Sequence, residues 1–98
     1  MDYSDMHYTY VLLSEKDGMF YTGSTSALRQ RIRHHQNGEV RSTSYRRPLN
    51  LIYFEACVSA SDAFRRERFL KTGKGKRYLR NRLAGFLVET EPKTLERP

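Results

Sequence analysis

Apolar and aromatic positions near the start of the chain predict a β-hairpin. Residues 8–13 (YTYVLL) are almost all aromatic, β-branched or aliphatic, a composition typical of a strand. Residues 15–18 (EKDG) predict a turn, because Gly18 adopts a positive φ without steric cost. A second strand is expected to return over residues 19–22 (MFYT), and Gly23 is expected to end it.

A helix is predicted directly after the hairpin. Residues 24–26 (STS) supply side chains that can cap a helix N-terminus, and residues 27–35 (ALRQRIRHH) are expected to form the helix. Gly38 suits the position just after a helix, where the backbone often turns left-handed. Hairpin and helix follow each other so closely that their side chains can share one surface.

The second half of the chain predicts a third strand and two more helices. Residues 49–58 (LNLIYFEACV) form a strand pattern that should pair with the hairpin as its central or edge partner. Capping residues at 59–62 precede a helix expected over about 60–71, which two glycines in residues 72–75 break. Residues 76–87 carry an apolar stripe that predicts a third helix.

These elements predict one small α/β domain, a three-stranded antiparallel sheet flanked by three helices. The 98 residues are enough for a single modest core. The domain is expected to span residues 8–87, with residues 1–7 as a flexible leader and residues 88–98 as a flexible tail.

The positive charge of the chain favours a negatively charged binding partner. The formal net charge is +7, and the cations cluster at four places, namely 29–33, 41–47, 65–71 and 74–82. Such clusters favour polyanions, and membrane binding is the alternative use of this charge. No apolar run is long enough to span a membrane, and the acidic, polar start (MDYSD) predicts no signal peptide. Cys57 has no cysteine to pair with, which suits a reducing cytoplasm.

Four polar side chains of the hairpin and first helix make a candidate chemical site. Tyr10 and Tyr21 lie on the paired strands, while Arg31 and His35 are four apart and therefore share one helix face. An arginine fork matches phosphate oxygens, and a phenol or imidazole can move a proton. Alternatively, the tyrosines are ordinary strand residues, Arg31 is a solvated charge, and His35 is a hydrogen-bonded helix residue. Thr43, Tyr53 and Asn81 are weaker candidates.

The same stretch resembles the GIY-YIG nuclease superfamily. Residues 8–10 (YTY) stand at the first motif, with tyrosine in place of glycine, and residues 21–23 (YTG) stand at the second, with threonine for isoleucine. The two motif tyrosines are eleven residues apart, and Arg31 follows the second by ten. Leu28 and His35 also fit, and the resemblance extends to about Arg77.

The resemblance implies roles for individual residues. Arg31 would stabilise charge on the pentacovalent phosphate, and one of Tyr10 and Tyr21 would activate the attacking water while the other orients it. Glu67, in the segment FRRERFLK, would be the ligand of Mg²⁺ or Mn²⁺. On the residues alone, a salt-bridged surface carboxylate is the usual role of a glutamate among arginines, as Glu67 is.

Further basic and aromatic residues are expected to hold the nucleic acid. The polar loop 39–48 (EVRSTSYRRP) should lie at the rim of the active face, where arginines can contact phosphates and a tyrosine can stack on a base. The alternative is that these are solvated loop charges. The candidate contacts are Arg41, Tyr45, Arg46, Arg47, Lys71, Lys74 and Lys76.

The function implied by the resemblance is divalent-metal-dependent endonuclease activity on DNA, in repair or recombination. Single-stranded and branched DNA are candidate substrates. The chain has no room for a separate DNA-reading domain, so target choice would come from DNA shape or from a protein partner. One rival is a nucleic-acid-binding module that has lost catalysis, and another is a structural protein of ribosomes or nucleoids.

Overall fold

The computed structural model describes residues 5–90 of the chain. The predicted leader and tail therefore fall largely outside the described residues. Within the described part, His7 is the first residue of a strand and residues 88–90 lie in a helix.

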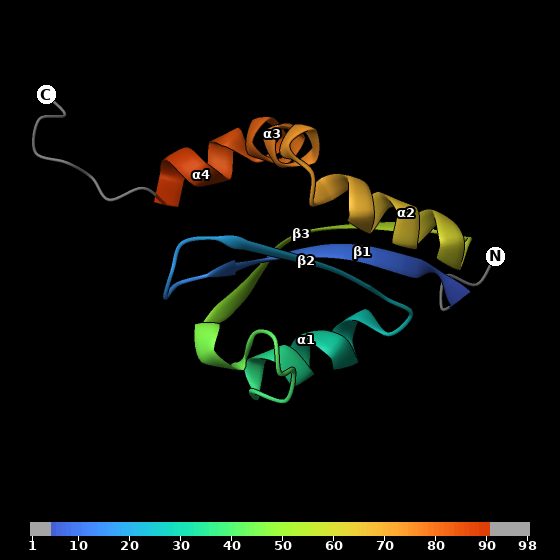
Figure 1. The fold of residues 1–98 in the computed structure, drawn as a ribbon, viewed down its shortest axis with the longest axis horizontal. Helices are drawn as coiled ribbons and strands as arrows, with labels where there is room; N and C mark the ends of the chain where they lie inside the picture. The colour runs from blue at the N-terminus through green and yellow to red at the C-terminus, as the bar shows by residue number, and fades with distance from the viewer. Residues whose placement is uncertain (1–4, 91–98) are drawn as a thin grey trace, which may run out of the picture.

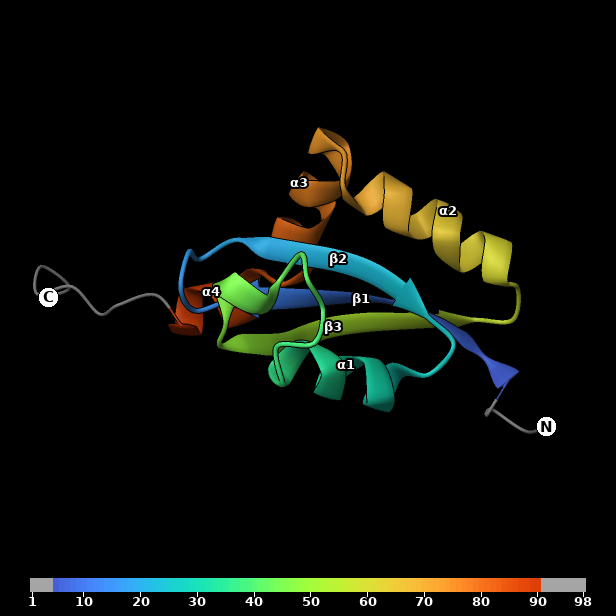
Figure 2. The same cartoon turned by 60° about the horizontal axis from the view of Figure 1, so that its bottom comes forward.

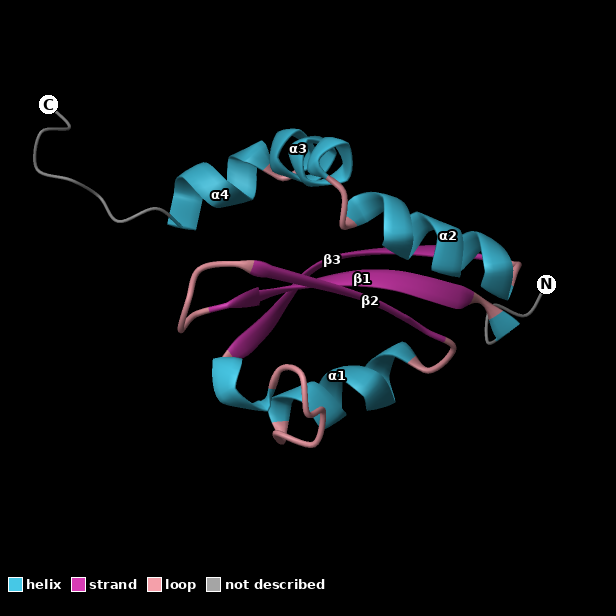
Figure 3. Cartoon of the chain, viewed as in Figure 1, coloured by secondary structure: helices cyan, strands magenta, loops and turns pink. Residues whose placement is uncertain are grey.

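Three antiparallel strands form one sheet with the order β2-β1-β3, so the first strand of the chain is central and the third is an edge strand. The helices lie on both faces of this sheet, which gives three layers (Figure 3). The α/β fold with a three-stranded antiparallel sheet, predicted from the sequence, is confirmed. The elements are β1 (His7–Ser14), β2 (Phe20–Thr25), α1 (Leu28–Gln36), the 3₁₀ turn η2 (Ser44–Arg46), β3 (Leu49–Cys57), α2 (Ala60–Leu70), α3 (Gly73–Arg82) and α4 (Ala84–Thr90).

The alternation of side chains along β1 divides the core between the two faces. Tyr10 and Leu12 point toward α1 and pack with Ile32 in one cluster. Val11 points to the opposite face, where it packs against Leu70 and Leu79 of α2 and α3. In Figure 1, α1 lies on one side of the sheet, and α2 and α3 lie on the other. A central strand buried on both faces therefore holds the two layers of helices together.

The segment between α1 and β3 lies beside α1 and reaches the turn of the hairpin (Figure 2). There the Ser14 hydroxyl donates to the Arg46 carbonyl at 2.6 Å, and the Lys16 ammonium donates to the Tyr45 carbonyl at 3.0 Å. Gly18 and Gly38 have φ values of +71° and +78°, as expected for the hairpin turn and for the residue after a helix. These contacts bring residues of the loop next to the strands.

The hairpin and the first helix differ from expectation at their junction. β2 does not end at Gly23 but continues to Thr25, because Gly23 pairs with Tyr10 across the sheet. The helix then begins at Leu28, and the Thr25 hydroxyl accepts the Ala27 N–H at 3.0 Å.

The third predicted helix is divided into two. α3 begins at Gly73, so the glycines expected to break a helix instead open one, and the Thr72 hydroxyl caps it by accepting the Gly75 N–H at 3.1 Å. α3 ends at Arg82, Leu83 has a non-helical backbone, and α4 follows from Ala84. No helix within residues 5–90 is both long enough and apolar enough to cross a bilayer.

Gly75 is expected to be indispensable for the contact between α2 and α3. A Cβ at this position would lie 2.0 Å from the Phe69 carbonyl oxygen and 2.5 Å from the Leu70 Cα, which are backbone atoms that cannot rotate away. We expect Gly75→Ala to lower the free energy of unfolding by about 1–3 kcal/mol in chemical denaturation. Gly73→Ala is the matched control, since a Cβ there meets nothing within 4 Å. Equal effects of the two substitutions would contradict this packing.

Candidate active site

The four side chains predicted to share a surface do come together between the hairpin and α1. The Tyr10 hydroxyl lies 2.8 Å from His35 Nε2, and Arg31 Nε donates to the same hydroxyl at 3.4 Å. The rings of Tyr21 and His35 are 5.1 Å apart and meet edge to face. The site therefore contains two phenols, a guanidinium and an imidazole in direct contact.

Tyr10 occupies its place because Gly23 has no side chain. Gly23 is the residue opposite Tyr10 in the sheet, and a Cβ on it would lie 2.5 Å from the Tyr10 hydroxyl. The Tyr10 side chain is only 1% exposed, in the middle of the central strand. Position 23 therefore has to be glycine, because the Tyr10 side chain fills the space that a Cβ would need.

His35 is fully buried, and both of its ring nitrogens have partners. Nδ1 lies 2.7 Å from the Thr43 hydroxyl, which lies 3.4 Å from the Val40 carbonyl. Thr43 donates its one proton to the Val40 carbonyl, so it accepts from Nδ1–H of His35. Nε2 then carries no proton and accepts from the Tyr10 hydroxyl. This network assigns the Nδ1–H tautomer to His35 and gives Thr43, a weak candidate from the sequence, the position behind it.

Burial sets the protonation states of this network. It lowers the pKa of His35 to about 4, and the neighbouring Arg31 and His34 charges act in the same direction. Burial also raises the pKa of the Tyr10 phenol, although the hydrogen bond from Arg31 opposes that shift. The same hydrogen bond raises the pKa of Arg31. At neutral pH His35 is therefore an uncharged acceptor, Tyr10 is protonated, and Arg31 keeps its charge.

Burial also distinguishes the two tyrosines. Tyr10 is enclosed, whereas Tyr21 on β2 is only partly buried and borders a cleft of about 280 Å³. Phe20, Leu70 and Leu79 line this cleft together with Lys71 and Lys76, so the cleft lies on the α2 and α3 face of the sheet and Tyr21 lies at its border. Tyr21 is therefore the phenol closer to solvent.

Glu67 reaches the edge of the sheet from α2. The Ser24 hydroxyl donates to Oε1 at 2.6 Å, and the Lys71 ammonium donates to Oε2 at 2.7 Å. The Glu67 side chain is 14% exposed, and its charge contributes to the raised pKa of Tyr10. The carboxylate is thus within electrostatic range of the phenol, and Ser24, predicted as a helix cap, is the residue that holds it.

The donor set around Glu67 fits a hard divalent cation bound by a single protein carboxylate. Residues 5–90 contain no cluster of three acidic, histidine or cysteine side chains. Mg²⁺ is often held by one or two carboxylates with water and substrate oxygens completing its shell. Lys71 already places a positive charge 2.7 Å from Oε2, and its side chain is 52% exposed. The carboxylate therefore sits where a cation is favoured.

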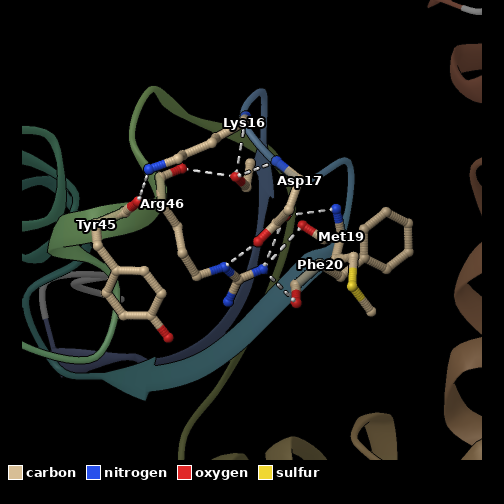
Figure 4. Close-up of polar contacts among 7 residues, drawn as sticks. Lys16, Asp17, Met19, Phe20, Tyr45 and Arg46 are labelled. Atoms are coloured by element: carbon tan, nitrogen blue, oxygen red, sulfur yellow. Dashed lines mark hydrogen bonds and ion pairs between the residues drawn. The ribbon is translucent and has the colours of Figure 1, made fainter.

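Arg46 has a different role from the one that the sequence predicts. Its guanidinium pairs with Asp17 at 2.7 Å and donates to the carbonyls of Met19 and Phe20 at 3.3 and 3.4 Å (Figure 4). This contact lowers the pKa of Asp17 to about 2, so the pair stays charged at neutral pH. The Arg46 side chain is 15% exposed, and its contacts join the loop to the hairpin turn.

The other predicted nucleic-acid contacts lie at the surface. Tyr45 is largely exposed, and Arg47 donates to the Ser44 carbonyl at 3.0 Å. Exposed side chains are found at Arg41, Tyr45, Arg47, Lys71, Lys74 and Lys76. Of the weaker candidates, Asn81 is exposed on α3, and the Tyr53 hydroxyl donates to Glu55 at 2.9 Å on the face of the sheet opposite the site.

Comparisons with known proteins place the chain beside one family and one solved structure. Residues 6–82 match the family described as the GIY-YIG catalytic domain. A UPF0213 protein of Staphylococcus saprophyticus is 41% identical over 69 residues, which are 69% of this chain and 83% of that protein. A UPF0213 protein of Staphylococcus aureus is 34% identical over 77 residues, covering 78% and 93% of the two chains. The solution NMR structure of the UPF0213 protein BH0048 from Bacillus halodurans aligns over 91% of this chain and 98% of its own, with a TM-score of 0.52 and 32% identity.

We expect Thr43 to fix the tautomer of His35. Thr43→Val leaves the buried Nδ1–H without an acceptor, which should cost about 1–3 kcal/mol of unfolding free energy. ¹⁵N NMR of the ring should show the Nδ1–H form in the wild type and a mixture of tautomers in the variant. Thr43→Ser keeps the hydroxyl and should restore the wild-type signals.

The same spectra also test the lowered pKa of His35. The folded protein should keep His35 neutral as the pH falls below the ordinary value of 6.5, until it approaches 4. Because the unfolded chain takes up this proton first, the contribution of His35 to stability is lost over that interval. An imidazolium signal at pH 6 would contradict the network.

Proposed function

Because the chain belongs to the GIY-YIG catalytic domain family, we propose that it is an endonuclease that hydrolyses phosphodiester bonds in DNA with a divalent metal ion. The observation that carries this proposal is the state of Arg31. Its guanidinium rests on the Tyr10 hydroxyl, and none of the ion pairs found within residues 5–90 involves it. A partly exposed cation without a carboxylate partner is suited to an external anion.

Arg31 is proposed to hold the scissile phosphate and to stabilise charge on its equatorial oxygens. The hydrogen bond to Tyr10 fixes the position of the guanidinium before substrate binds, and a preorganised donor stabilises a transition state more than a mobile one. His35 keeps Tyr10 in place from the other side. The buried network therefore acts as a support for Arg31.

Tyr21 is the phenol proposed to contact the attacking water. It is partly exposed at the cleft edge, whereas Tyr10 is enclosed by Gly23, Arg31 and His35. The water, oriented by the Tyr21 hydroxyl, would attack phosphorus in line as the bond to the 3′ oxygen breaks. The proton that the water loses would pass to solvent at the open side of Tyr21, and the 3′ oxygen would take up a proton from solvent. The products are a 5′-phosphate and a 3′-hydroxyl.

Glu67 is proposed to hold the metal ion, Mg²⁺ or Mn²⁺, together with waters and substrate oxygens. When bound there, such an ion would supply Lewis-acid stabilisation of charge at the leaving 3′ oxygen. Ser24 would keep the carboxylate oriented, and Lys71 would leave Oε2 for a phosphate of the strand.

Exposed cations around the cleft are proposed to hold the DNA backbone. Lys71 and Lys76 line the cleft beside Tyr21, and Lys74 lies on the same turn of α3 as Lys76.

The loop between α1 and β3 is proposed to extend this basic surface through Arg41, Tyr45 and Arg47, with Tyr45 able to stack on a base. A small cytoplasmic nuclease of this kind would suit repair or recombination, with a protein partner supplying target choice.

Arg31 is expected to affect turnover far more than it affects folding. Arg31→Ala should lower kcat by roughly 10²–10³-fold, because a preorganised donor to the transition state is lost. The matched control is Arg65→Ala on α2, an exposed arginine paired with Asp62, which should keep wild-type kcat. Equal kcat values for both variants, measured on the same labelled DNA, would remove Arg31 from the active site.

Glu67 is expected to determine the response to metal. Glu67→Gln keeps an oxygen for Ser24 but removes the charge, so cleavage should fall on the order of 10²-fold while DNA binding persists. Mn²⁺ binding, followed by electron paramagnetic resonance, should weaken in parallel. Asp62→Asn, on the same helix and also paired with a cation, should change neither quantity. Unchanged Mn²⁺ affinity in Glu67→Gln would place the ion elsewhere.

A further inference from the structure

A second hollow lies on the side of α1 away from the active site, between that helix and β3. It is larger than the cleft beside Tyr21, with a volume of about 1090 Å³, and it is open to solvent. β1 and β3 supply Tyr8, Leu51 and Phe54, and α1 supplies Leu28 and Ile32. None of these residues belongs to the catalytic set, so the hollow is separate from the proposed site of hydrolysis.

An exposed aromatic side chain forms part of the wall of this hollow. Phe54 is 50% exposed although it lies in a strand directly opposite Tyr10. Its ring meets the ring of Tyr8 edge to face, with centroids 6.0 Å apart. A half-exposed aromatic pair on a sheet face presents π-surface that a planar group can cover.

Two arginines without partners stand over the same hollow. Arg29 and Arg33 are four apart on α1, are exposed, and line the hollow. Within residues 5–90 no ion pair or side-chain hydrogen bond engages either guanidinium, and α1 itself contains no acidic residue. Arg46 and Arg66, by contrast, are paired with carboxylates. The charge over the hollow therefore favours an anion.

We propose that this hollow binds an unpaired stretch of DNA, with bases on Phe54 and Tyr8 and phosphates on Arg29 and Arg33. Aromatic platforms with flanking cations bind single strands because every base has a face that can stack, whereas bases in a duplex are already stacked. The proposal rests on the proposed function, since the strand would be part of the substrate that α1 presents to Arg31 on its other side. It makes the enzyme selective for DNA with an unpaired segment.

Tryptophan fluorescence tests this directly, because the chain contains no tryptophan. Full-length protein with Phe54→Trp is titrated with oligo(dT) in EDTA, so that no cleavage occurs. Stacking should quench at least about half of the emission. Phe64→Trp is the matched control, since Phe64 is 54% exposed on α2 and also lies near an arginine, Arg68, at 5.9 Å. Its emission should change little.

The arginines are tested by salt dependence. The double variant Arg29→Ala/Arg33→Ala should weaken oligo(dT) binding and flatten the slope of log Kd against log salt by about 1.4, the value for two phosphate contacts on a single strand. Binding to a blunt duplex should change less. A larger loss of duplex binding than of oligo(dT) binding in the double variant would overturn the proposal. So would unchanged Phe54→Trp emission under conditions where anisotropy shows that oligo(dT) binds.

Three further results would separate this proposal from its alternatives. A dimer in light scattering that becomes a monomer in Phe54→Ala would assign the hollow to a second copy of the chain and overturn it. Metal-dependent cleavage of duplex DNA without quenching would leave the proposed function standing and remove only this site. Quenching without any cleavage would leave the site and remove the function.

Discussion

The hydrogen bond between the Tyr10 hydroxyl and His35 Nε2 joins the central strand to α1 in a place that solvent does not reach. Other features follow from it. Gly23 must lack a side chain to leave room for the phenol, and Thr43 must accept from the far side of the imidazole. The loop that carries Thr43 is in turn fastened to the hairpin by Arg46 and Asp17. A buried, satisfied polar network of this kind specifies one arrangement of strand, helix and loop.

The arginines fall into two groups, those paired with a carboxylate of the protein and those that can bind an external anion. Arg46 and Arg66 each contact a carboxylate and hold elements together. Arg31 rests on a neutral phenol, and its charge is not balanced by a nearby acid within the described residues. A guanidinium supported by a hydroxyl is held in place and remains attractive to phosphate. The same contrast sets Arg29 and Arg33 apart from the paired arginines of α2.

The sequence was sufficient to predict the sheet, α1 and α2, because strand alternation and helical spacing are local properties. It placed the tyrosines on paired strands and Arg31 on a nearby helix face, but their convergence depends on how α1 packs against the hairpin. It did not show that Gly75 opens a helix against Phe69, since that depends on a close approach between two backbones. It also did not distinguish Arg46 from its neighbours, because its partner Asp17 lies 29 residues away in the chain. The sequence indicated Thr43 only as a weaker candidate and Ser24 only as a helix cap, since each acts through a residue on another element.

The measurement that tests the central claim most directly is end-group analysis of DNA incubated with the wild-type protein. Labelled single-stranded, duplex and flap DNAs would be compared in Mg²⁺, Mn²⁺ and EDTA. A hydrolytic site built on Arg31 and Glu67 predicts metal-dependent products with 5′-phosphate and 3′-hydroxyl ends. Folded protein that binds these DNAs but yields no product with either metal would contradict the account and identify a nucleic-acid-binding module on the same fold.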